Sequence, residues 1–123
     1  MELELLSGRF AVARLEPACG VPSWARGPSF VSVTHTADET SVVCDEELVP
    51  SEVTSEMGFV GLKVPGPIPF TEVGVLASIA RPLAAAGVSI FAVSTFDTDY
   101  VFLRGADLEK AGASLAEAGH SLR

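Results

Sequence analysis

The sequence contains few of the residues that usually carry catalysis or metal binding. Its 123 residues include only two histidines, two cysteines, one tryptophan and one tyrosine. His35 has no second histidine, cysteine or acidic side chain at the spacing of a metal site, and His120 lies in the terminal tail. The motifs of serine hydrolases, zinc proteases and phosphate-binding loops are all missing. The sequence therefore predicts no catalytic residue, no metal site and no cofactor.

The cysteines give little support for a covalent or metal-bound framework. Cys19 and Cys44 lie far apart in the sequence and do not form a C-x-x-C pair. Two reduced, partly buried thiols are the simplest interpretation and are typical of a cytosolic protein. The spacing alone leaves a disulfide or a shared metal open.

Positive charge is also scarce. The chain has 8 lysines and arginines against 16 aspartates and glutamates, a net charge of -8 and a pI near 4.6. No cluster of basic residues interrupts this acidity. Because an acidic surface repels phosphate groups, nucleic acid and anionic membranes are excluded as expected partners.

Long apolar runs are missing as well. No stretch reaches the length of a transmembrane helix without a glycine, a proline or a charge. The first residues carry acids, Glu2 and Glu4, where a signal peptide needs bases. We therefore expect a cytoplasmic protein. Hydrophobic residues still make up 48% of the chain, enough for one compact domain or two small units that share a core.

The stretch from Gly58 to Leu103 gives the clearest indication of secondary structure. An apolar strand, Phe59 to Val64, leads into the loop Pro65-Gly66-Pro67-Ile68-Pro69. A helix follows and ends at Gly87. A strand from Val88 to Thr95, a turn and a second strand from Tyr100 to Arg104 come next. The helix is predicted from apolar residues at i, i+3, i+4, i+7 and i+8 spacing: Leu76, Ile79, Ala80, Leu83 and Ala84.

A second helix is expected near the C-terminus. Asp107 can cap it, Leu108, Ala111 and Leu115 recur at helical spacing, and Gly119 ends it. Little length then remains for a final strand. The second half therefore reads β-α-β-β-α, the order of a ferredoxin-like split β-α-β unit without its last strand.

The first half has the same order with shorter helices. Two strands around Ser7-Gly8 precede a loop, Glu16 to Pro28, and a hairpin joins Phe30–His35 to Thr40–Asp45. Residues 48–57 fit either a short helix or a loop. We predict an α+β fold of two intertwined ferredoxin-like units, with an antiparallel sheet and helices on one face. Residues 1–57 form the degenerate unit and residues 58–123 the better-formed unit.

The start of the long helix suggests a binding site. Backbone N–H groups of its first turn, around Glu72 to Val75, can hold a carboxylate, and Gly74 lets a ligand approach the backbone. Glu72 and Asp99 can hold an ammonium or guanidinium group, so the pattern fits a zwitterion. Two alternatives stay open: Glu72 complements the helix dipole as an ordinary first-turn acid, and Asp97 and Asp99 are turn residues or an acid–base pair.

At these residues the chain resembles a known family. The segments PFTEVGVLASIARPLAAAGVSIFAVSTFDTDYVFL and SFVSVTHTADETSVVCDEELVP are similar to tandem ACT-domain proteins, especially small bacterial aspartokinase-like regulatory proteins and eukaryotic cytosolic arginine sensors. The resemblance covers roughly Arg9 to Leu108. It implies a regulatory protein that binds an amino acid between ACT units. This chain has two such units where the sensors have four, so the resemblance favours a homodimer.

The resemblance also implies the ligand contacts. They fall on the helix start, on the end of the following strand and, by a weaker match, on the first unit. The implied residues are Glu72, Gly74, Val75, Thr95, Phe96, Asp99, Ser41 and Val42.

Two other functions remain as hypotheses. One is an interaction module that oligomerises, or recruits a protein partner, through an open sheet edge without a ligand. The other is an enzyme, for which the sequence offers no nucleophile or acid–base pair. Pro82, inside the long helix, should kink it.

Overall fold

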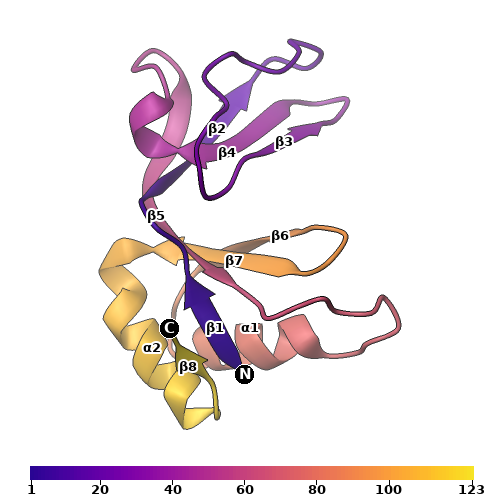
Figure 1. The fold of residues 1–123 in the computed structure, drawn as a ribbon. Helices are drawn as coiled ribbons and strands as arrows, with labels where there is room; N and C mark the ends of the chain where they lie inside the picture. The colour runs from indigo at the N-terminus through magenta and orange to yellow at the C-terminus, as the bar shows by residue number, and fades with distance from the viewer. The chain divides into compact units, whose positions relative to one another are not determined.

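The computed structural model describes all residues from Met1 to Arg123. The chain forms a mixed α+β fold with an eight-stranded sheet and two helices, which confirms the predicted fold class (Figure 1). It divides into two compact bodies. The small body comprises Ser7–Phe59, and the helical body comprises Met1–Leu6 together with Val60–Arg123.

The elements in chain order are β1 (Glu2–Leu5), β2 (Phe10–Leu15), β3 (Ser32–His35), β4 (Thr40–Asp45), β5 (Thr54–Lys63), α1 (Val75–Ala85), β6 (Ile90–Ser94), β7 (Asp99–Arg104), α2 (Leu108–Glu117) and β8 (Ser121–Leu122). Short 3₁₀ turns at Glu46–Leu48 and Gly105–Asp107 follow β4 and β7. No helix is both long enough and apolar enough to cross a membrane.

The small body is an antiparallel sheet in the order β3-β4-β2-β5. The predicted hairpin is confirmed, with His35 opposite Thr40 at its turn. One face buries small and β-branched side chains, and Trp24 of the preceding loop packs against them. Residues 48–57 form neither of the predicted alternatives in full, because the sheet already resumes at Thr54. The buried core residues of this body are Ala11, Ala13, Val42, Cys44 and Val49.

In the helical body, α1 and α2 lie side by side on one face of the strands. The apolar stripe of α1 buries Ile79 and Leu83 completely, and α2 buries Ala111 and Leu115. These helix residues pack on side chains from one face of the strands, including Val101. The alternating inward residues of the strands and the apolar stripes of the helices therefore form one core. Each fully buried aliphatic side chain contributes about 1.5–3 kcal/mol to folding.

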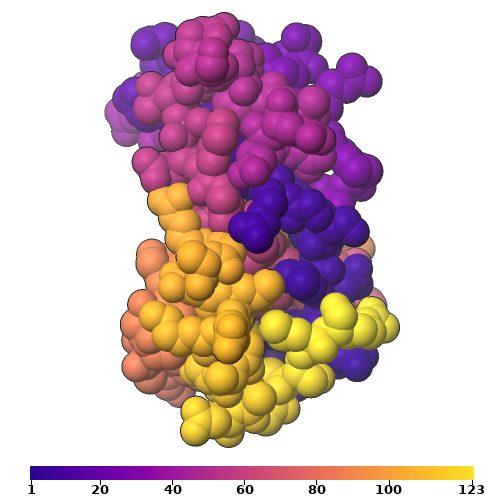
Figure 2. All heavy atoms as spheres, turned by 90° about the vertical axis from the view of Figure 1, so that its left-hand side faces the viewer, coloured from indigo at the N-terminus to yellow at the C-terminus, as the bar shows by residue number.

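The structure corrects two expectations for this body. A last strand does exist: β8 follows Gly119 and pairs in parallel with β1, Glu2 opposite Ser121. Figure 2 shows these two ends of the chain in contact. Two residues suffice because β1 offers a ready edge beside β5, to which it is antiparallel. Asp107 also makes no side-chain cap, because a 3₁₀ turn leads directly into α2.

The order of the strands in the helical body is therefore β6-β7-β5-β1-β8. β1 is contributed from the start of the chain and lies between β5 and β8. The boundary drawn from the sequence between Met57 and Gly58 is close to the division of the chain, but it assigns β1 to the other unit. Long-range pairing of this kind leaves no local pattern in the sequence.

Candidate functional site

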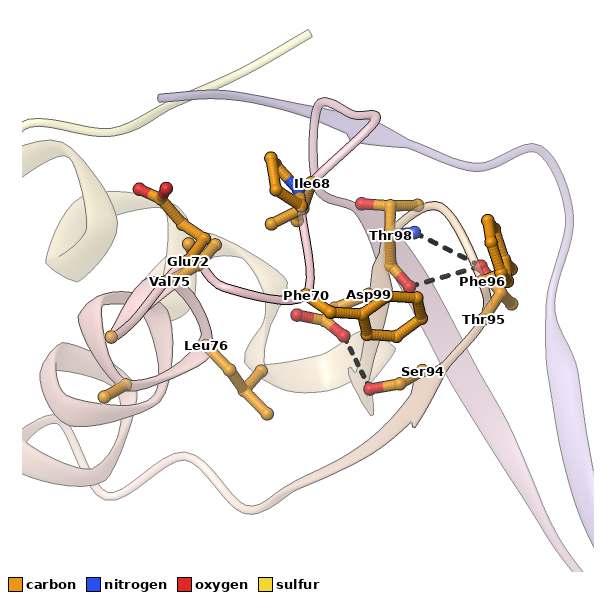
Figure 3. A pocket seen from close by; sticks show the side chains of 13 residues that line it. Ile68, Phe70, Glu72, Val75, Leu76, Ser94, Thr95, Phe96, Thr98 and Asp99 are labelled. Carbon is orange, nitrogen blue, oxygen red and sulfur yellow. Dashed lines mark hydrogen bonds between the residues drawn. The ribbon is translucent and has the colours of Figure 1, made fainter.

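A cavity of about 340 Å³ lies in the helical body, where the loop before α1 faces the turn between β6 and β7 (Figure 3). It is formed by three segments: the loop, the first turn of α1 and the β6–β7 connection. The residues that line it are Ile68, Pro69, Phe70, Glu72, Gly74, Val75, Leu76, Ala77, Ser94, Thr95, Phe96, Thr98 and Asp99.

The loop is held in place by the β6–β7 turn. Thr98, only 6% exposed, donates a hydrogen bond from its hydroxyl to the carbonyl of Val64 at 2.7 Å. The backbone N–H of Ile68 donates to the carbonyl of Asp97, also at 2.7 Å. At Gly66 a Cβ would lie 3.1 Å from that same carbonyl oxygen, so the missing side chain permits the close approach. These contacts attach the proline- and glycine-rich loop to the β6–β7 turn.

The turn itself is stabilised by hydroxyl groups. Thr95 donates its backbone N–H to the carbonyl of Thr98 at 2.8 Å, and its hydroxyl accepts from the N–H of Thr98 at 3.4 Å. Ser94 donates its hydroxyl to the carboxylate of Asp99 at 2.5 Å, which orients that carboxylate beside the cavity (Figure 3). Asp97 is exposed and does not line the cavity. Sequence reasoning missed Ser94 and Thr98, although the run S-T-F-D-T-D carries their signal.

The start of α1 differs by a few residues from the prediction. The helix begins at Val75, after Gly74 in the left-handed conformation with φ 83°. Glu72 therefore precedes the helix, and its N–H donates to the carbonyl of Pro69. The alternative in which Glu72 is an ordinary first-turn acid is therefore contradicted, since the first turn of α1 contains no acid.

The first turn of α1 has free donors. No side chain caps it, and the first helical N–H with a partner is that of Ser78, which donates to the carbonyl of Gly74 at 3.0 Å. The N–H groups of Val75, Leu76 and Ala77 therefore have no partner within the helix, as expected for an uncapped N-terminus. All three residues line the cavity.

The charges of the cavity are of one sign. Its only ionisable side chains are Glu72 and Asp99, and no lysine, arginine or histidine lines it. Figure 3 shows Asp99 beside Ser94, with the carboxylate of Glu72 pointing away from Asp99. Two carboxylates with nearby N–H donors can receive a molecule that carries both a cationic group and a carboxylate.

Two aromatic rings stand at this site. Phe70 and Phe96 pack edge to face with ring centroids 5.3 Å apart, yet they are 78% and 80% exposed. Val73, in the same loop, is 91% exposed. Phe96 was expected at the site from the family resemblance, whereas Phe70 was not. Large apolar side chains that are this exposed and this close together indicate a surface that is stabilised when a ligand or a partner buries it.

Ser41 and Val42 do not line this cavity. Both lie on β4 in the small body. Val42 is fully buried in the core of that body, so it has no surface for a ligand. Ser41 is half-buried on the opposite face of the same strand and lines a separate hollow with Arg14 and Glu56.

The two cysteines are free thiols in different surroundings. Cys19 is exposed and Cys44 is buried. Burial raises the pKa of the Cys44 thiol; a hydrogen bond from the backbone of Arg26 opposes this, and the charge of Asp45 adds to it. No group of three or more histidine, cysteine or acidic side chains is placed to hold a metal ion.

Comparison with known proteins places the chain in a family. A family model described as an ACT domain matches residues 54–117, and a second model, of an N-terminal domain, matches residues 8–52. The chain is 43% identical to a protein of Agobacterium tumefaciens with a known crystal structure, covering 99% of this chain and 91% of that one with a TM-score of 0.93. The chain therefore belongs to the ACT-domain family. A search of curated proteins gives no match.

More distant solved structures share the fold. A Vibrio cholerae protein of unknown function, described as a possible transport protein, is 18% identical, with a TM-score of 0.77 over 95% of this chain and 88% of that one. Clostridium acetobutylicum aspartate kinase is 17% identical, with a TM-score of 0.66 over 92% of this chain and 33% of the enzyme. The regulatory subunit of aspartate kinase from Thermus thermophilus is 12% identical, with a TM-score of 0.59 over 94% and 93%. The structural neighbours thus include aspartokinase regulatory domains.

Proposed function

We propose that this protein is a non-catalytic regulator that binds an amino acid in the cavity at the start of α1. One observation carries the proposal: free N–H donors and two carboxylates line one cavity that contains no cationic side chain. The ligand carboxylate takes the N–H groups of Val75, Leu76 and Ala77. Its ammonium group takes Asp99, whose orientation Ser94 fixes.

Glu72 refines this proposal. The carboxylate of Glu72 lies apart from that of Asp99. A ligand with two cationic groups, such as the arginine bound by the sensors that the sequence resembles, can therefore place one group on Asp99 and the other on Glu72. Gly74, Thr95 and Phe96 complete the proposed contacts. Aspartokinase regulatory domains among the structural neighbours support a regulatory role for the fold. The two free thiols favour a cytoplasmic location.

We further propose that the site is completed in a homodimer. Strand β6 pairs only with β7, so its other edge is open. No charged residue occurs between Pro82 and Phe96, and edge strands normally carry such residues to prevent association. The exposed Phe70 and Phe96 line the cavity, and the exposed Val73 lies in the same loop as Phe70. A second copy that joins β6 to β6 covers these side chains and closes the cavity between two ACT units.

In this proposal the chain is a tandem of ACT-like units, with the small body as the degenerate unit and the helical body as the ligand-binding unit. We retain Ser41 as a proposed ligand contact that the degenerate unit contributes in the homodimer. Val42 is fully buried, so its proposed role is limited to holding Ser41 in position.

A thermal-shift screen of the purified protein against the standard amino acids tests the proposal. A ligand at 100 times its dissociation constant stabilises the fold by about 2.7 kcal/mol, a shift of several degrees. Asp99→Asn and Glu72→Gln should each abolish or strongly reduce the shift. Glu109→Gln, on the exposed surface of α2, removes the same kind of charge and should leave the shift unchanged.

The open edge of β6 also favours a second function, an interaction module without a ligand. This alternative predicts a dimer in solution and a flat screen. A dimer with no response to any amino acid would therefore refute the sensor proposal and support the module. A clear response that Asp99→Asn leaves intact would refute the assignment of the site.

A further inference from the structure

Pro82 lies inside α1, where a proline is normally unfavourable. It has no N–H group, so it cannot donate the helical hydrogen bond that residue 82 would make to the carbonyl of Ser78. The helix nevertheless continues to Ala85. Pro82 therefore leaves one helical carbonyl, that of Ser78, without its usual partner.

The freed carbonyl is taken by a residue from the end of the chain. Nε2 of His120 lies 3.0 Å from the carbonyl oxygen of Ser78. A carbonyl oxygen can only accept, so Nε2 carries the hydrogen and donates it. Nδ1 of the same ring lies 3.1 Å from the backbone nitrogen of Met1. His120 therefore connects α1 with the first residue before β1 and the last residue before β8.

The segments on the other side of His120 are themselves paired. The N–H of Ser121 donates to the carbonyl of Met1 at 2.9 Å, and that of Arg123 donates to the carbonyl of Leu3 at 2.8 Å. The β1–β8 pair thus reaches α1 through one imidazole ring in addition to its apolar contacts. β8 is only two residues long, so the imidazole contact adds to a small number of backbone hydrogen bonds.

The contact point lies directly next to the cavity. Ala77 is the last residue of α1 that lines the cavity, and Ser78 follows it. Ser78 donates its N–H to the carbonyl of Gly74 and its hydroxyl to the carbonyl of Val75 at 2.6 Å. A bond at the carbonyl of Ser78 therefore acts on the same turn that presents free N–H groups to the cavity.

We propose that Pro82 and His120 form a latch: the proline frees the carbonyl of Ser78, and His120 uses it to fix the β1–β8 pair to the first turn of α1. The latch sets the position of the turn that lines the cavity. It gives the proline, which local helix propensity disfavours, a structural role. The latch exists whether or not the cavity binds an amino acid, so its test is independent of the proposed function.

A double-mutant cycle tests the latch, using wild type, Pro82→Ala, His120→Ala and the double variant in thermal unfolding. With Pro82 present, His120→Ala should lower Tm by roughly 4 °C, the effect of losing a hydrogen bond of about 1 kcal/mol. In the Pro82→Ala background the helix supplies its own donor to Ser78, so His120→Ala should cost less than half as much. His120→Gln, which keeps an N–H donor, should recover part of the loss.

A local measurement separates the latch from general destabilisation. Amide hydrogen exchange at Ser78 and Ile79 should accelerate several-fold in His120→Ala, while β5 and β7 keep their protection. His35→Ala is the matched control, because His35 makes one hydrogen bond, to Thr40, in the small body. Its effect should be the same in the wild-type and Pro82→Ala backgrounds.

Two results would overturn the latch. One is an equal loss of Tm for His120→Ala in the wild-type and Pro82→Ala backgrounds. The other is faster exchange spread evenly over the helical body, with no excess at Ser78. Either result would mean that the imidazole contact contributes nothing that depends on the proline.

Discussion

The hydroxyl of Thr98 donates a 2.7 Å hydrogen bond to the backbone carbonyl of Val64, across 34 residues of sequence. This bond joins the end of the β5 segment to the turn between β6 and β7. Both partners are almost fully buried. The loop that carries Phe70 and Glu72 begins directly after Val64, so this bond fixes one end of the cavity.

We predict that Thr98→Val destabilises the protein by about 1–3 kcal/mol, because a buried carbonyl loses its donor while the volume of the side chain is kept. Urea unfolding should show a lower midpoint with an unchanged slope. Thr98→Ser keeps the hydroxyl and should lose clearly less. A stable Thr98→Val variant beside a destabilised Thr98→Ser variant would show that the methyl group matters and the hydrogen bond does not.

Gly74 should be sensitive to substitution by alanine. It has φ 83°, and a Cβ there would meet nothing within 4 Å, so the cost comes from the backbone alone. We expect Gly74→Ala to lower stability by about 1–2 kcal/mol, and Gly74→Asn, which tolerates this conformation, to lower it less. Chemical denaturation of the three proteins checks the order. Alanine and asparagine variants of equal stability would contradict the conformational explanation.

The packing of α1 makes a third prediction. Leu83 is completely buried, so Leu83→Ala should cost about 2–5 kcal/mol through lost transfer energy and a new cavity. Leu48→Ala removes the same atoms from a side chain that is 40% exposed and should cost much less. Denaturant midpoints measure both. If Leu48→Ala lost as much stability as Leu83→Ala, burial in this structure would not predict the contribution of a side chain to the free energy of unfolding.

The thiols should react at very different rates. Cys19 is exposed, while burial both shields Cys44 and raises its pKa, so at a given pH less of it is the reactive thiolate. We expect one fast and one slow phase with a thiol reagent at mildly alkaline pH, and two fast equivalents in urea. Cys19→Ser should remove the fast phase. A fast phase that survives this substitution would place Cys44 at the surface.

The open edge of β6 leads to the last prediction. Ala92 is exposed on this strand, and a lysine there is the kind of residue that protects natural edges. Ala92→Lys should convert the proposed dimer to a monomer in light scattering after size exclusion. Ala116→Lys, at an exposed alanine on α2, is the control and should remain dimeric. Dissociation of the control, or a dimer that survives Ala92→Lys, would argue against association through β6.

Much of the fold can be predicted because its signals are local. The period of Leu76, Ile79 and Leu83 indicates a helix with one buried face, and the structure confirms it. The turn between His35 and Thr40 is an equally local signal. The exact start of α1 was missed by a few residues, because Gly74 in a left-handed conformation delays the helix and leaves Glu72 outside it.

What the sequence by itself determined is the class of fold and, apart from β1 and β8, the order of strands and helices in the helical body. Only the tertiary structure decided that β1 lies between β5 and β8 and that Thr98 fastens the loop after Val64. It alone brought His120 to the carbonyl that Pro82 leaves free. These are contacts between segments far apart in the chain, and their energies depend on geometry that no local period or propensity encodes.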